Sequence, residues 1–132
     1  MTQLIKKLSE PKPLLLIGVL YTLLVTIAFL FPKSQIPQVN ILELDKLVHV
    51  LIHGILSFIW LCYWFSTDKY HFSNKIVFVI LSVCFLYGLA IEASQHLFTL
   101  SRQFDAFDIL ANSIGSLIGL LAFWIFIRVK NQ

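Results

Sequence analysis

The residues that could do chemistry gather at the heads of two apolar segments and in the stretch between residues 92 and 112. Carboxylates, amides and a cation there interrupt a chain that is otherwise strongly apolar. Ionisable groups within hydrocarbon cost free energy, and where they occur they are usually functional. We therefore interpret the stretch from Glu92 to Gly119 as the functional centre, which the other segments hold in place.

Glu92 is the most informative residue of this stretch. It shares one face of a predicted helix with Gln95 and His96, because these residues lie three and four positions away. A carboxylate held about 7 to 8 Å inside the end of a span, by the helical rise, could act as a general acid or base, carry a proton or anchor an ion pair. A structural hydrogen bond between helices is the alternative.

A second polar face carries Asp45, His49 and His53, at positions i, i+4 and i+8 of one helix. Such a set could bind a divalent metal ion. No dense group of cysteines and histidines completes the coordination, so we predict no metal site. In the alternative interpretation Asp45 caps its helix and the histidines form hydrogen bonds across helices.

An internal similarity relates the two halves of the chain. Residues 44–49 resemble residues 107–112, with an aspartate at the head of each apolar segment and a polar residue four positions later. Asp108 would then cap the last helix as Asp45 caps the second, and each half would be a helical hairpin.

Two cations complete the constellation. Arg102 can hold a phosphate or carboxylate with its planar guanidinium, and Lys46 stands beside Asp45 at a helix start, where helix N-termini favour anions. A phosphorylated lipid headgroup would suit these groups. A simple ion pair between Arg102 and either Asp105 or Glu92 is the alternative.

The composition identifies the elements that must position these residues. Of the 132 residues 58% are hydrophobic and 13% charged, and the mean hydropathy is +0.85, which is typical of an integral membrane protein. We predict one all-α domain over residues 1–132, a bundle of four transmembrane helices in two hairpins. The predicted spans are about 13–31, 46–65, 76–97 and 109–127. The net charge of +3 does not indicate nucleic-acid binding, since the basic residues form no contiguous stripe.

Lysine and arginine are more frequent in the segments on the side of the chain termini than in the other two loops. The positive-inside rule therefore predicts cytoplasmic termini and places the polar residues at the outer face. Gly115 and Gly119 form a GxxxG motif, which predicts close helix packing within the chain or in a homo-oligomer. Cys62 and Cys84 lie in apolar runs and are expected to be small buried residues.

The motif Asp45-Lys46-xx-His49, followed by Glu92-xx-Gln95 and a third set of polar positions, resembles the VanZ-like family of bacterial membrane proteins. The third set consists of Arg102, Asp105, Asp108, Asn112 and Gly115. The resemblance implies a small multi-pass protein of the bacterial inner (cytoplasmic) membrane, in a family whose namesake is associated with low-level resistance to the glycopeptide teicoplanin. The resemblance assigns neither a cofactor nor a catalytic residue. His53 and His96 lie outside the family pattern.

The leading hypothesis is an outward-facing pocket that binds or modifies an envelope component, such as a lipid-linked precursor or a lipid headgroup. The catalytic candidates are Glu92 and His49. The substrate-binding candidates are Asp45, Lys46, Gln95, Arg102, Asp105, Asp108 and Asn112. One rival is a non-enzymatic scaffold or subunit whose polar residues lock the bundle. Another is a proton- or ion-coupled carrier, which would need polar residues continuing to the inner face, where the spans offer almost none.

Overall fold

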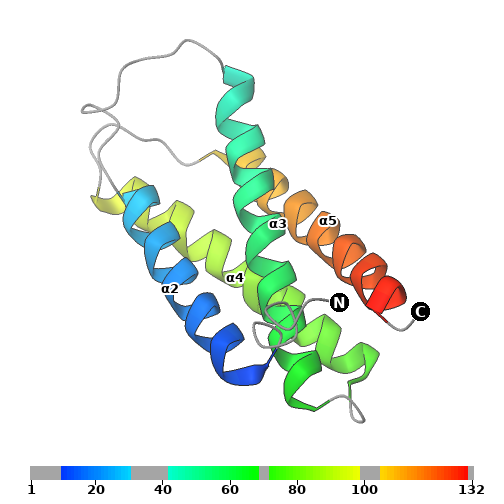
Figure 1. Cartoon of the computed structure of the whole chain (residues 1–132). Coiled ribbons are helices and arrows are strands. Elements are labelled where there is room, and N and C mark those ends of the chain that lie inside the picture. Colours follow the sequence, from blue (N-terminus) through cyan, green and yellow to red (C-terminus); the bar gives the residue numbers. More distant parts are fainter. Residues whose placement is uncertain (1–9, 31–41, 69–71, 99–104, 131–132) are drawn as a thin grey trace.

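The described part of the chain folds into four long α-helices (Figure 1). The computed structural model describes residues 10–30, 42–68, 72–98 and 105–130. The helices are α2 (Pro11–Leu30), α3 (Leu42–Thr67), α4 (Asn74–Phe98) and α5 (Ala106–Lys130). Each is long and apolar enough to cross a membrane, because 20 residues of helix extend about 30 Å. The predicted all-α fold with four spans is confirmed, and each helix extends beyond the range predicted for it at one end at least.

The distribution of side chains is the reverse of that in a water-soluble protein. Large apolar residues cover the outside of all four helices, among them Leu24, Phe78, Leu86 and Leu121. Among the described residues, eight polar ones are buried between the helices, namely His49, His53, Ser57, Glu92, Gln95, Asp108, Asn112 and Ser116. An apolar exterior is stable against lipid but not against water. The chain is therefore a multi-pass membrane protein, while the orientation of its termini stays a prediction.

The closest packing in the bundle is between α3 and α5, which run in the same direction (Figure 1). Small residues make this approach feasible. A Cβ atom added to Gly115 would collide with the backbone carbonyl of Val50, and one added to Gly119 would collide with Ser57 and the carbonyl of Gly54. The packing role predicted for the GxxxG motif is thus confirmed, and its partner is α3 of the same chain. A homo-oligomer through the same glycines stays a prediction.

Further contacts tie α2 to α3 and α4, and α4 to α3 and α5. Apolar side chains fill the half of the bundle where α3 ends and α4 begins. Tyr21 on α2 donates a hydrogen bond to the carbonyl of Ile52 at 3.1 Å. The core of that half is apolar, built around Leu56, Leu61 and Phe123. Cys62 and Cys84 are buried free thiols within it, as expected.

The two proposed capping aspartates do not cap their helices. α3 already begins at Leu42, because no helix-breaking residue separates that position from Asp45. α5 begins at Ala106, and its N-cap is Asp105, whose Oδ1 accepts a hydrogen bond from the backbone N–H of Phe107 at 2.8 Å. Asp45 and Asp108 lie inside their helices, beyond the N-cap positions.

Candidate functional site

Six of the candidate residues meet where α3 and α5 begin and α4 ends. This polar cluster consists of Lys46, His49, Glu92, Asp105, Asp108 and Asn112. Four of its members are buried, namely His49, Glu92, Asp108 and Asn112. The remainder of the bundle separates these groups from lipid, which is the condition under which polar side chains persist in a membrane.

Two rows of polar residues face each other across the α3–α5 contact. The row on α3 is His49, His53 and Ser57, and the row on α5 is Asp108, Asn112 and Ser116. Both rows follow an i, i+4, i+8 spacing, which places each row on one helix face. His49 Nδ1 lies 3.0 Å from Asn112 Oδ1, and the Ser57 hydroxyl donates to the Ser116 carbonyl at 3.1 Å. His49 and Asn112, which correspond to each other in the two similar segments of the chain, are therefore in contact.

Ser57 and Ser116 are members of these rows that the sequence analysis missed. Both serines are fully or almost fully buried. The signal that could have found them is the continuation of the i+4 spacing for one more step on each helix. Because serine often bonds to its own helix, this signal alone does not distinguish a row member from a solitary residue.

Lys46 connects the start of α3 to the start of α5. Its Nζ atom lies 3.1 Å from Asp105 Oδ2 and 3.6 Å from Asp108 Oδ1. The backbone N–H of Phe107, together with the Lys46 ammonium, holds the pKa of Asp105 below its ordinary value. The pair lies at the mouth of the cluster, since the side chains of Lys46 and Asp105 remain 37% and 39% exposed.

Glu92 joins α4 to the start of α5. The carboxylate is 2% exposed, and its Oε1 accepts a hydrogen bond from the backbone N–H of Asp105 at 2.9 Å. Glu92 therefore anchors the residue that caps α5. This contact corresponds to the structural alternative for Glu92, and it leaves the proposed acid–base role as a prediction.

Gln95 lies one turn further along α4 and holds α2. Its Nε2 donates to the carbonyl of Phe29 at 2.7 Å. That carbonyl belongs to the last turn of α2, whose backbone acceptors have no partner within the helix. Gln95 is thus placed beside the polar cluster but is directed toward α2.

Several buried atoms of these rows have no hydrogen-bond partner among the described residues. They include Nε2 of His49, both ring nitrogens of His53 and Oδ1 of Asp108. The His53 ring packs against Tyr87 with a centroid separation of 6.0 Å. The fold therefore leaves imidazole groups in the interior with unused hydrogen-bonding capacity.

The remaining candidates divide into two cases. Asp45 is half-buried, and one of its carboxylate oxygens approaches His49 and Asp108. Arg102 lies outside the described residues. Of the nine candidates, the structure thus brings six into the polar cluster and places Asp45 and Gln95 next to it.

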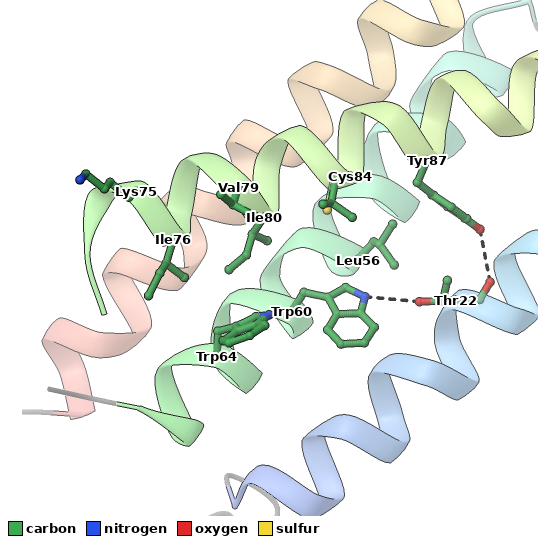
Figure 2. Close-up of a pocket in the computed structure, with 11 residues that line it drawn as sticks. Thr22, Leu56, Trp60, Trp64, Lys75, Ile76, Val79, Ile80, Cys84 and Tyr87 are labelled. Carbon is green, nitrogen blue, oxygen red and sulfur yellow. Dashed lines mark hydrogen bonds between the residues drawn. The ribbon is translucent and has the colours of Figure 1, made fainter. Parts of the chain in front are cut away.

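A separate groove opens between α2, α3 and α4 in the other half of the bundle (Figure 2). It has a volume of about 490 Å³. Trp60 Nε1 donates to the Thr22 hydroxyl at 3.3 Å, and the Tyr87 hydroxyl donates to the Thr22 carbonyl at 3.3 Å. The rest of its lining is almost entirely apolar, apart from Lys75 at one end (Figure 2). Among the described residues, no carboxylate or imidazole lines the groove, and the described groups suited to chemistry belong to the polar cluster.

Comparison with known proteins identifies the family of the chain. None of the curated proteins and none of the solved structures matches the chain significantly. The family model described as VanZ/LLP1 matches residues 4–127, and this range includes all four helices almost completely and every residue of the polar cluster. The chain therefore belongs to the VanZ/LLP1 family.

Proposed function

We propose that this protein binds the phosphorylated headgroup of an envelope lipid, a phospholipid or a lipid-linked cell-wall precursor, at the polar cluster. The observation that carries the proposal is the unused hydrogen-bonding capacity of buried imidazoles, at His49 Nε2 and at both ring nitrogens of His53. A buried polar atom without a partner costs about 1 to 3 kcal/mol. A bundle that used these groups for packing alone would be more stable with apolar residues in their place.

The charge at the mouth of the cluster indicates the class of ligand. Lys46 is held by an exposed ion pair with Asp105, and exposed pairs of this kind contribute about 0 to 1 kcal/mol. A phosphate can therefore take the place of the carboxylate at little cost. The N-termini of α3 and α5 lie at the same end of the bundle, and their dipoles also favour an anion.

The protein would act in the bacterial inner membrane, with the polar cluster at the outer face. The basic residues at the opposite end and the family's association with teicoplanin resistance support this placement. Binding of a lipid-linked precursor would alter the supply or presentation of the glycopeptide target. If a chemical step follows binding, Glu92 is its acid or base candidate, with one of its carboxylate oxygens, Oε1, accepting the N–H of Asp105.

The test compares two lysine substitutions in the full chain. Lys46→Gln removes the cation at the cluster, and Lys75→Gln removes an exposed lysine near the α3–α4 turn. We expect mass spectrometry of the purified proteins to recover phosphorylated lipid from the wild type and from Lys75→Gln, and several-fold less from Lys46→Gln. Thermal unfolding should differ little among the three, because the ion pair is exposed.

Cells provide the second measurement. Glu92→Gln keeps an oxygen that can accept the Asp105 N–H but removes the group that could act as acid or base. If a chemical step follows binding, this variant should reduce teicoplanin tolerance while membrane levels stay constant. Equal lipid recovery from all variants, together with unchanged teicoplanin tolerance in Lys46→Gln and Glu92→Gln, would contradict headgroup binding. Strongly lowered thermal stability in Lys46→Gln with unchanged lipid recovery would instead favour a scaffold.

The carrier alternative is less well supported by the interior of the bundle. Within the described residues, the buried polar groups extend from the polar cluster to Ser57 and Ser116. Beyond that level the buried core consists of Leu61, Val77, Phe123 and other apolar side chains. A proton or ion path would need polar groups there, because hydrocarbon-like surroundings do not solvate charge.

A further inference from the structure

We propose that Asp45, His49 and Asp108 bind one divalent transition-metal ion at the mouth of the polar cluster. One ligand atom from each of the three lies within 4.8 Å of the other two. Asp45 and His49 are one turn apart on α3, and the close contact between α3 and α5 brings Asp108 to the same place. The set differs from the one considered in the sequence analysis, since Asp108 of another helix replaces His53.

The hydrogen bond of the His49 ring is the first argument. Nδ1 lies 3.0 Å from Asn112 Oδ1, an amide oxygen that can only accept. Nδ1 therefore carries the proton, and in the neutral ring Nε2 presents its lone pair on the opposite side. Metal-binding histidines typically have this arrangement, in which an oxygen outside the coordination shell orients the ring.

The surroundings of Nε2 are the second argument. His49 is 0% exposed, and Nε2 has no hydrogen-bond partner within the part of the chain that the structure describes. It faces Asp108 Oδ2 at 3.8 Å, so a lone pair and a carboxylate oxygen point at each other. This contact is longer than a hydrogen bond, whose N···O distance is about 2.7 to 3.2 Å. A wider separation suits an ion held about 2.0 to 2.2 Å from each ligand atom.

Charge and ligand type define the ion. Two carboxylates balance a divalent cation, and one imidazole with two carboxylates suits Zn²⁺ or Mn²⁺ better than a hard ion that prefers oxygen alone. Lys46 does not block the site, because its Nζ is nearer to Asp105 (3.1 Å) than to Asp108 (3.6 Å). Three protein ligands leave a coordination position for water or another oxygen ligand.

A bound cation would also explain how a cluster rich in carboxylates accepts an anion. The open position could take a phosphate oxygen, a role that rests on the proposed headgroup binding, whereas binding of the ion itself does not. The ion would convert a site whose described carboxylates repel phosphate into one that attracts it.

The experiment measures Zn²⁺ and Mn²⁺ binding by titration calorimetry on the full chain in detergent, after removal of metal with a chelator and without added lipid. We expect one equivalent to bind to the wild type. Asp45→Asn and Asp108→Asn should weaken binding by more than about 100-fold, and Asn112→Ala, which removes the partner of the His49 ring, by about 10- to 100-fold. His96→Gln, which removes an exposed histidine of α4 outside the polar cluster, is the matched control and should retain the wild-type affinity.

Asp45 is half-buried, so the Asp45→Asn variant should fold even if a variant at a buried position does not. Unfolding curves recorded without metal verify the folding of each variant. X-ray absorption on the Zn²⁺ form should detect a single imidazole among oxygen ligands. Absence of saturable binding, or unchanged binding in Asp45→Asn and Asp108→Asn, would overturn the metal site. Zn²⁺ binding without recovery of phosphorylated lipid would support the metal site and contradict headgroup binding. Recovery of phosphorylated lipid without Zn²⁺ binding would support headgroup binding and contradict the metal site.

Discussion

Replacing Gly115 by alanine should destabilise the bundle, because the new methyl group would meet the backbone of α3. An added Cβ would lie 2.9 Å from the Cα and the carbonyl carbon of Val50, and closer to its carbonyl oxygen. Carbon atoms in favourable contact are about 3.5 to 4.0 Å apart. The two helices would therefore have to separate by about 0.6 Å or more, and the hydrogen bond from Ser57 to the Ser116 carbonyl would lengthen.

The magnitude follows from two opposing effects. Overpacking a well-packed interior costs about 1 to 3 kcal/mol, and the upper value applies because the neighbouring atoms are backbone and cannot rotate away. Alanine also improves helix propensity over glycine by about 1 kcal/mol. The net loss in the free energy of unfolding should be about 2 kcal/mol.

Gly18 on α2 provides the matched control. A Cβ added there would lie 3.4 Å from Ile59 and Trp60, which is ordinary contact with side chains. Gly18→Ala should therefore keep or raise stability by up to about 1 kcal/mol. Unfolding of both variants in mixed detergent micelles, followed by circular dichroism, measures the two effects. Gly115→Ala as stable as Gly18→Ala would refute the close packing of α3 on α5.

Three further predictions concern the polar cluster and its neighbours. Acid should weaken the Lys46–Asp105 contact. The pKa of Asp105 is lowered in the folded state, so the stabilisation from this ion pair is complete above the ordinary pKa of about 3.9. This stabilisation disappears as the pH falls through the lower pKa of the folded state. The difference in melting temperature between wild type and Asp105→Asn should therefore decrease as the pH is lowered below the ordinary pKa of the carboxylate, and a constant difference would contradict the pairing. Gly88→Ala should cost about 1 to 3 kcal/mol in unfolding experiments, because its Cβ would lie 2.9 Å from the Asn112 amide; a stabilised variant would show that Asn112 is not held there. Gln95→Leu should lower the free energy of unfolding by about 1 kcal/mol. It should also accelerate hydrogen exchange in the last turn of α2, because Gln95 binds the carbonyl of Phe29 there. Unchanged exchange would show that Gln95 does not hold the end of α2.

The composition and the spacing of residues were sufficient for the fold class. Four apolar runs of the length needed to cross a bilayer predict four helices, since backbone groups in hydrocarbon must be satisfied within each segment. The polar spacing also predicted that Asp45 and His49 share a face, and likewise Asp108 and Asn112. These are local properties of one helix, and local geometry depends only on the order of residues.

The helix starts were predicted less well, because capping depends on contacts that a single position does not reveal. Asp45, Asp105 and Asp108 are all plausible N-caps by residue type. Asp105 is the N-cap because two contacts fix it. The backbone N–H of Asp105 donates to Glu92 of α4, and the carboxylate of Asp105 accepts from the backbone N–H of Phe107. Such a choice involves residues that are 13 positions apart.

The meeting of His49 with Asn112 and Asp108 was decided by the tertiary structure alone. These residues are about 60 positions apart, and they touch because glycines on α5 allow its backbone to approach that of α3. A GxxxG motif indicates close packing but does not name the partner helix or its register. The partner and the register together place an imidazole lone pair opposite two carboxylates, and this arrangement changes a set of polar residues into a candidate cation site.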